Sequence, residues 1–172
     1  MVLIFTLLAG CLNARPVPPI VGPVDVSTVV VVESPEHADM LTAPPPVQAA
    51  LSRALKSQGL KLNSIETPGN FQSLGTTQHR LNWIHEQNDG TVLLVETSIR
   101  PRGHLGGRYR WQVDATISVT TQPDGQLREE LTIPVTLQHI HQQETDALIE
   151  ASTQIADRAA TMLSRQLRGS TP

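Results

Sequence analysis

The stretch YRWQVDATISV, residues 109–119, decides the fold of this chain. Its odd-numbered positions are aromatic or aliphatic, and its even-numbered positions are polar or charged. Because successive side chains of a β-strand point to opposite faces, this alternation predicts a strand with one buried face. Leu127–Leu137 repeats the pattern, with Leu131, Ile133, Val135 and Leu137 as its apolar positions. The two stretches together predict an antiparallel hairpin.

Pro123-Asp124-Gly125 lies between the two predicted strands and indicates a turn. A three-residue hairpin loop ends on a left-handed residue, and Gly125 suits that position. With such a loop Gln122 pairs with Gln126, and apolar residues face one another across the hairpin. A shift by one residue would place apolar side chains opposite polar ones. The predicted pairs are Ile117 with Leu131, Ala115 with Ile133, Val113 with Val135 and Trp111 with Leu137.

Outward from the hairpin, hydrophobic periodicity predicts three further strands and three helices. Thr91–Ile99 carries apolar residues on both faces, as is typical of a central strand. Pro134 cannot donate a ladder hydrogen bond, so its strand is expected to lie at a sheet edge or to be bulged. Pro46 suits the first turn of a helix, and Gly59 suits its end. The predicted elements are strands at 26–32, 60–65, 91–99, 109–119 and 127–137, and helices at 47–58, 77–87 and 145–168.

This order, β-α-β-α-β-β-β-α, predicts an α+β fold with a mixed or antiparallel sheet and helices on one face. The length of 172 residues favours one domain, which we place at residues 25–172. The net charge of −3 and the aromatic content of 3% argue against nucleic-acid binding, which needs a basic face or stacking platforms. Cys11 is the only cysteine, which excludes an intrachain disulfide and a cysteine-based zinc cluster.

The first ten residues carry no charge and are mostly apolar. They are too few to span a bilayer, but they suit the apolar core of a secretory signal. Leu8-Ala9-Gly10-Cys11 resembles the lipobox of bacterial lipoproteins. That resemblance implies a signal peptide at 1–10, removal of this peptide, and acylation of Cys11 with chains such as palmitate. The alternative is a buried N-terminal strand with a chance cysteine.

Residues 11–24 contain Pro16, Pro18, Pro19 and Pro23, which favour extended backbone. We expect a semi-rigid tether between lipid and domain; the alternative is an irregular loop packed on the domain. In the lipoprotein family an Asp after the cysteine commonly marks inner-membrane retention, and here Leu12 follows Cys11. The resemblance therefore implies a lipid-anchored protein on the periplasmic face of the outer membrane.

The predicted element order is also similar to that of several small periplasmic lipoproteins. The residues that carry this likeness are Pro46–Leu55, the hairpin opened by Tyr109–Val119, and the closing helix Ile149–Leu167. The families are the lipopolysaccharide-assembly lipoprotein, the penicillin-binding-protein activator lipoproteins, and the curli-secretion and TolB N-terminal domains. What they imply jointly is a non-catalytic accessory protein that docks on a protein partner in a cell-envelope complex, with no cofactor.

The most distinctive local chemistry lies between Arg100 and Arg110. Arginine forks match the paired oxygens of phosphates and carboxylates. We therefore predict a contact site in a Gly-rich hairpin loop; the alternative is a solvated tip whose charge offsets an acidic domain. The candidate binding residues are Arg100, Arg102, His104, Arg108 and Arg110.

Other chemistry is weakly represented in the sequence. His139 and His141 lie two apart and Glu144 follows, so they could hold a metal, although a helix cap explains Glu144 more simply. No nucleophile elbow, phosphate loop or metalloprotease motif is present. We expect no metal, no cofactor and no enzymatic activity. Two alternatives stay open: a binding module for anionic lipid, lipopolysaccharide or peptidoglycan, and a periplasmic enzyme.

Overall fold

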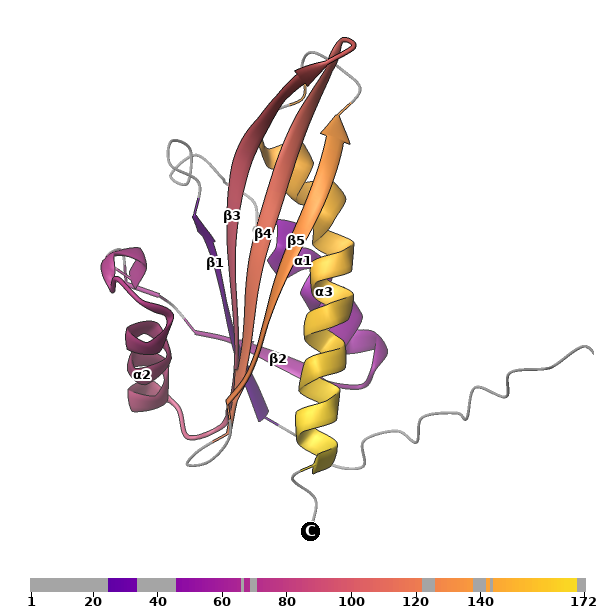
Figure 1. Cartoon of the computed structure of the whole chain (residues 1–172). Helices are drawn as coiled ribbons and strands as arrows, with labels where there is room; N and C mark the ends of the chain where they lie inside the picture. Colours follow the sequence, from indigo (N-terminus) through magenta and orange to yellow (C-terminus); the bar gives the residue numbers. More distant parts are fainter. Residues whose placement is uncertain are drawn as a thin grey trace, which may run out of the picture.

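The computed structural model describes residues 25–33, 46–65, 67–68, 71–121, 126–137, 142 and 144–169 (Figure 1). Within these residues, three α-helices and five strands follow one another in the order that the sequence predicts. Their bounds are β1 Asp25–Glu33, α1 Pro46–Ser57, β2 Lys61–Ser64, α2 Thr77–Gln87, β3 Thr91–Leu105, β4 Arg108–Thr120, β5 Gln126–Leu137 and α3 Glu144–Gly169, with a 3₁₀ turn at Phe71–Ser73.

The five strands form one mixed sheet in the order β2-β1-β3-β4-β5. β1 pairs in parallel with both β2 and β3, whereas β3, β4 and β5 form an antiparallel meander. The α+β fold is confirmed, as is the central place of β3. β5 is an edge strand, which agrees with the prediction from Pro134, a residue that cannot donate to a further strand.

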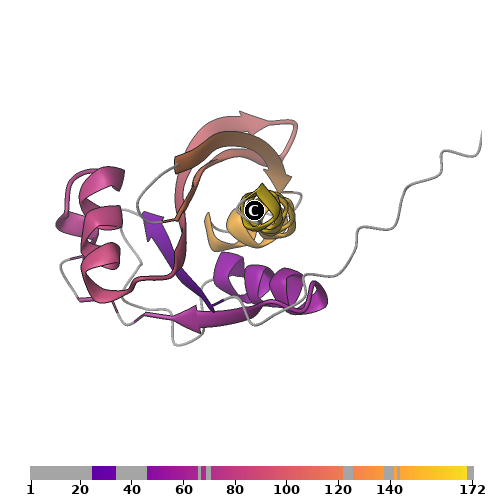
Figure 2. The same cartoon turned by 90° about the horizontal axis from the view of Figure 1, so that it is seen from below.

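α1 and α3 cover one face of the sheet and make the main hydrophobic core with it (Figure 1). Figure 2 shows β3, β4 and β5 curving around α3, so we call this the inner face. β4 contributes the odd-numbered residues that the alternation predicted to be buried. The core residues of the three long strands are Leu93, Val95, Ile99, Val113, Ala115, Ile117, Val119, Ile133, Val135 and Leu137.

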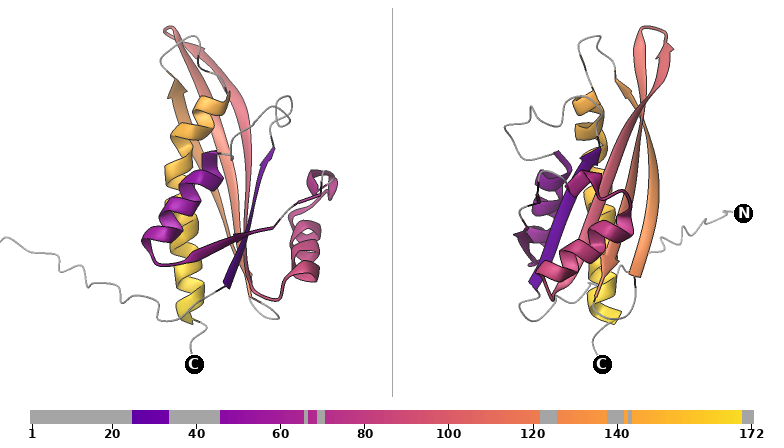
Figure 3. Two further views of the ribbon diagram at one scale, coloured as in Figure 1. Left: turned by 180° about the vertical axis from the view of Figure 1, so that it is seen from behind. Right: turned by 90° about the vertical axis from the view of Figure 1, so that its left-hand side faces the viewer.

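α2 lies on the other face of the sheet, so the prediction that the helices share one face is wrong for this helix (Figures 1 and 3). Its Leu81 and Ile84 pack on Val92 and Leu94. These two residues belong to the even-numbered row of β3, which points to this face. β3 is apolar on both faces because each face is covered by different helices. The physical reason is that β3 has a second apolar face, which must also be covered, so one helix packs on the outer side of the sheet.

A buried ion pair fixes α2 to this outer face. The guanidinium of Arg80 on α2 donates to Oε1 of Glu96 on β3, and both side chains are almost completely buried. The hydroxyl of Thr77 donates to Oε2 of Glu96 at 2.6 Å. Both oxygens of the Glu96 carboxylate thus have partners from the first two turns of α2.

The register of the β4–β5 hairpin differs from the predicted one by two residues. Thr120 pairs with Gln126, and Ile117 faces Glu129 instead of Leu131. A two-residue shift keeps every side chain on its predicted face, which is why the face was right and the register was wrong. Glu129 accepts a hydrogen bond at 2.5 Å from Nε of Arg158 on α3, a contact that raises the pKa of Arg158. Gly125 lies outside the described residues.

Gly59 ends α1, as predicted. Its φ of 76° is in the left-handed region, which glycine adopts without a steric penalty. The amide of Gly59 donates to the carbonyl of Lys56 at 3.1 Å, and the amide of Leu60 donates to the carbonyl of Leu55 at 3.0 Å. These two bonds form a Schellman motif, which satisfies carbonyls at the helix end.

His85 of α2 gives the stability of the protein a dependence on pH. Its Nε2 lies 2.5 Å from the hydroxyl of Thr120, and its Nδ1 is buried with no hydrogen-bond partner among the described residues. Burial lowers the pKa of His85, so the folded state favours the neutral ring. The unfolded chain therefore binds a proton more readily, and stability falls as the pH drops through the ordinary histidine pKa of about 6.5.

We expect the free energy of unfolding to decrease more in the wild-type protein than in His85→Gln between about pH 7.5 and about pH 5. Glutamine keeps a polar group near Thr120 and does not titrate. Denaturant unfolding at several pH values measures the difference. Equal losses in the two proteins would contradict the assignment to His85.

Candidate contact site on the arginine hairpin

The predicted hairpin loop is in fact a continuous β-ribbon. β3 runs six residues beyond its predicted end, and only Gly106 and Gly107 separate it from β4. Their φ values of 59° and 79° are both left-handed, as a two-residue type I′ turn requires. We call Arg100–Arg110 the arm. Figure 3 shows its tip projecting beyond β1 and α3.

A bulge places Arg102 on the outer face of the arm. The register of β3 against β4 shifts between Pro101 and Gly103, which leaves Arg102 as the extra residue. A bulge re-aims the side chain of the residue that it inserts. Arg102 then points to the same face as Gln112, to which its guanidinium is hydrogen-bonded.

The other three arginines share this outer face. Arg100 lies opposite Gln112 and reaches Asp114, and Arg108 and Arg110 belong to the same even-numbered row of β4 as Gln112 and Asp114. All four arginines are exposed. Because Arg100–Arg110 contains no carboxylate, this face of the arm is strongly cationic although the chain as a whole is acidic.

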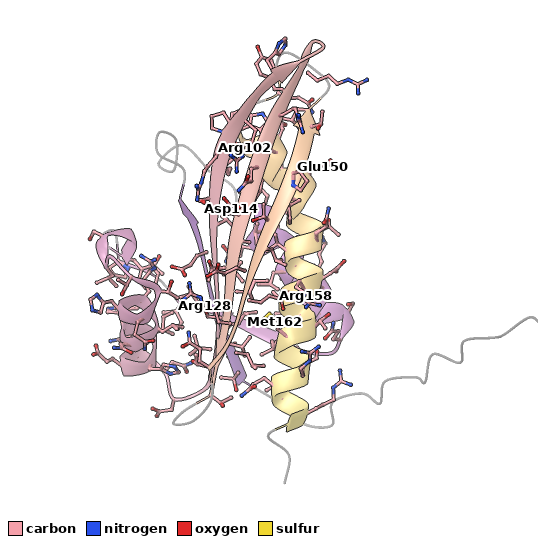
Figure 4. All side chains as sticks on the ribbon, in the orientation of Figure 1. Arg102, Asp114, Arg128, Glu150, Arg158 and Met162 are labelled. Carbon is pink, nitrogen blue, oxygen red and sulfur yellow. The ribbon has the colours of Figure 1, made fainter. Side chains whose placement is uncertain are left out.

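A chain of hydrogen bonds runs along the base of the arm, where Figure 4 labels Arg102 and Asp114. Oδ1 of Asp114 accepts from the hydroxyl of Thr132 at 2.9 Å and from Nε2 of Gln112 at 2.6 Å. Oε1 of Gln112 accepts from Nε of Arg102 at 2.6 Å and also from Nη2 of the same side chain. Nη2 of Arg100 lies 3.4 Å from Oδ2 of Asp114. Arg102 is therefore held by hydrogen bonds to β4, and Arg100 lies beside a carboxylate of the same strand.

Arg108 and Arg110 extend from the half of the arm nearest its tip, and they lack such support. Neither the Arg108 nor the Arg110 side chain forms a hydrogen bond or ion pair within the described part of the chain. Arg108 and Arg110 can therefore offer their positive charges to a partner without a fixed direction. Arg102 differs because Gln112 holds its guanidinium in a defined position, and Arg100 lies beside Asp114.

The inner face of the arm is aromatic. His104 pairs with Tyr109 across the ribbon, and their ring centroids lie 5.0 Å apart. Trp111, the next inner residue of β4, is half-buried against the main core. The arm thus presents guanidinium groups on one side and aromatic rings on the other, a composition that is enriched in protein–protein contact surfaces.

A shallow groove of about 370 Å³ continues the outer face below the arm. Its charged groups have partners: Glu96 binds Arg80, Asp114 faces Arg100, and Glu130 binds Arg128. The lining residues are Glu96, Thr97, Ser98, Arg100, Gln112, Asp114, Ala115, Thr116, Glu130, Leu131 and Thr132.

The long edges of the sheet are poorly suited to the addition of a strand. Along the described residues, β1 pairs with β3 only as far as Ser98. Beyond that residue, no described strand pairs with the edge of β3 that faces away from β4. That edge contains Pro101, which has no N–H, and the bulge at Arg102. Pro134 interrupts the other edge, on β5. Proline and bulges are devices that block pairing of edge strands, so contacts through the arm must use side chains.

The structure brings the four predicted arginines of the arm to one face, places His104 on the opposite face, and leaves other predicted residues untested. Cys11, His139 and His141 lie outside the described residues, as does the side chain of Glu144. No group of three potential metal ligands occurs among the residues that the structure describes. In the same part of the chain, no helix has the length and apolar character needed to cross a membrane.

Sequence reasoning missed Gln112, Asp114 and Thr132 as parts of the site. The alternation of β4 already placed the first two on the face of Arg108 and Arg110, so the signal was there. What the sequence could not give is the bulge, which brings Arg102 within reach of Gln112.

The chain matches no model of a protein family, and no curated protein matches it. Solved structures with a similar course of the chain include bacterial lipoproteins. Rare lipoprotein B from Shewanella oneidensis has 10% identity and a TM-score of 0.40, with 83% of this chain and 94% of that chain covered. A minor lipoprotein from Acinetobacter baumannii has 16% identity and a TM-score of 0.43, with 84% and 92% covered. A lipoprotein from Neisseria meningitidis has 15% identity and a TM-score of 0.40, with 86% and 100% covered.

Proposed function

We propose that this protein is a non-catalytic accessory lipoprotein of the cell envelope that docks through its arm on an acidic partner protein. The observation that carries the proposal is the set of four exposed arginines on one face of a two-stranded ribbon. Exposed guanidinium groups steer an anionic partner and bind its carboxylates in pairs. The partner surface is therefore rich in Asp and Glu.

A protein partner accounts for two features that a charged lipid surface does not require. Arg102 is held in place by Gln112, and Arg100 lies beside Asp114, which favours recognition of oxygens at defined positions. The opposite face of the arm offers His104 and Tyr109, and aromatic residues together with arginine are enriched in protein interfaces. The runner-up is a binding module for anionic lipid, lipopolysaccharide or peptidoglycan.

The proposed location depends on Cys11. In this proposal residues 1–10 are a signal peptide, acylated Cys11 anchors the chain to the periplasmic face of the outer membrane, and residues 11–24 are the tether. More than one acyl chain gives stable membrane residence. Mass spectrometry of the protein extracted from the envelope is expected to find acylated Cys11 as the first residue. An unmodified cysteine with the leader still attached would contradict the anchor.

The arm is tested by replacing Arg100, Arg102, Arg108 and Arg110 with alanine. We expect this variant to bind a fluorescent glutamate decapeptide about tenfold more weakly or worse, because several exposed ion pairs are lost. Added salt should weaken wild-type binding, since exposed charges are screened. A charge-matched control replaces the exposed residues Arg53, Lys56, Arg165 and Arg168 of α1 and α3 with alanine and should bind as the wild type does.

Vesicles containing phosphatidylglycerol serve as the second probe. The proposal expects the arm variant and the charge-matched control to differ in peptide binding. Equal losses in these two variants would show a general charge effect and would overturn the role of the arm. Arm-dependent binding to the vesicles without binding to the peptide would overturn the acidic protein partner in favour of the lipid-binding alternative.

A further inference from the structure

We propose that Gln112 is a positioning residue that holds the guanidinium of Arg102 ready for end-on binding of a partner carboxylate. This inference rests on the proposed function and deepens it, because it states how the arm recognises its partner. It assigns to Gln112 and its support Asp114 a role in binding although neither needs to touch the partner.

Gln112 contacts one edge of the Arg102 guanidinium and leaves another edge available. One oxygen of Gln112, Oε1, accepts from Nε and from Nη2 of Arg102. A guanidinium has five N–H donors in a planar fork. Gln112 occupies the side of the fork formed by Nε and Nη2. The end formed by Nη1 and Nη2 keeps three donors, which is the edge that binds a carboxylate with two parallel bonds.

Gln112 is itself held by Asp114 and, through it, by β5. Its Nε2 donates to Oδ1 of Asp114 at 2.6 Å, so the orientation of the Gln112 amide is fixed with its oxygen toward Arg102. Oδ1 of Asp114 is itself fixed by the hydroxyl of Thr132 on β5 at 2.9 Å. Residues from three adjacent strands thus form one line of hydrogen bonds that ends at the exposed guanidinium.

Holding the Arg102 side chain before the partner arrives lowers the entropy cost of binding. An arginine side chain that is free in solution loses rotamer freedom when a partner immobilises it, and this loss weakens binding. At Arg102 much of that loss has already occurred on folding. Arg108 and Arg110 have no such support among the described residues, so they contribute charge, whereas Arg102 contributes charge and direction.

Two variants that keep the formal charge test this role. Gln112→Met removes the hydrogen-bonding amide at similar volume, and Arg102→Lys keeps the cation but removes the fork. We expect each to weaken binding of the glutamate decapeptide about threefold to tenfold, which corresponds to one side chain that is no longer held in advance. The slope of log Kd against log salt should stay unchanged, because the number of paired charges is the same.

Combining the two changes separates positioning from a general structural effect. Each change removes the hydrogen bonding between Gln112 and Arg102. The double variant should therefore bind the peptide as tightly as whichever single variant has the lower affinity. Thr116→Val is the matched control, since Thr116 lies on the outer face of β4 without contacting an arginine through any hydrogen bond that the structure describes. It should bind as the wild type does.

The outcomes distinguish this inference from the proposed function. If the four-arginine variant loses peptide binding while Gln112→Met binds as the wild type does, the positioning role is overturned and the docking arm stands. Additive losses in the double variant would also overturn the positioning role. If the wild-type protein itself does not bind the peptide, the proposed function fails first. Arg102→Lys keeps the test decisive if Gln112→Met folds poorly, because Arg102 is exposed.

Discussion

Replacing Arg80 with methionine is expected to destabilise the protein by about 3–5 kcal/mol. The change leaves the Glu96 carboxylate buried without its cation, with only the hydroxyl of Thr77 as a partner among the described contacts. A buried charge that loses its partner costs far more than an exposed ion pair contributes. Chemical denaturation of the purified protein measures the free energy of unfolding.

Two further variants make this prediction specific. The double variant Arg80→Met with Glu96→Leu should recover most of the lost stability, because it removes the stranded charge as well as its partner. Arg128→Ala breaks the exposed pair with Glu130 and should change stability by about 1 kcal/mol or less. If Arg80→Met and Arg128→Ala cost the same, the ion pair between α2 and β3 does not fix the helix.

Replacing Leu148 with alanine is expected to cost about 2–5 kcal/mol of stability. Leu148 is 1% exposed and belongs to the main core between α3 and the sheet. The neighbouring residue Ile149 is 53% exposed on the same helix, so Ile149→Ala should change stability by about 0.5 kcal/mol or less. Thermal or denaturant unfolding of the two variants compares aliphatic side chains of similar size one position apart.

Equal costs for the two substitutions would contradict the placement of α3. A large cost for Ile149→Ala alone would mean that the helix is rotated by about one residue about its axis, 100° in an α-helix. Comparing Leu148→Ala with Ile149→Ala therefore tests which side of α3 packs on the inner face of the sheet.

The elements of this fold could be predicted from the sequence wherever a single face is buried. β4 alternates so regularly that its inner and outer residues were assigned correctly, and the helix at Thr77–Gln87 has the predicted bounds. Its end follows from Asn88-Asp89-Gly90, a turn signal that does not depend on distant parts of the chain. Local chemistry was sufficient in these cases.

The sequence failed where a distant residue decides between local alternatives. In the hairpin, Glu129 lies opposite Ile117 and accepts a hydrogen bond from Arg158 of α3, a distant contact that the local alternation does not reveal. The arm was predicted to be a loop because Pro101 and its glycines disfavour strands, yet pairing with β4 overrides that preference. The candidate site shows the same division: its arginines were evident from the sequence, and the hydrogen bonds that hold Arg102 were not.

The two prolines on the long sheet edges also bear on how copies of this protein behave together. Identical molecules with bare strands on both sides could join head to tail into open-ended fibres, since each new copy would offer the next one a fresh template. Pro101 and Pro134 each remove a donor from one side, so neither flank offers a full template. Pairing between copies along these two edges is therefore disfavoured.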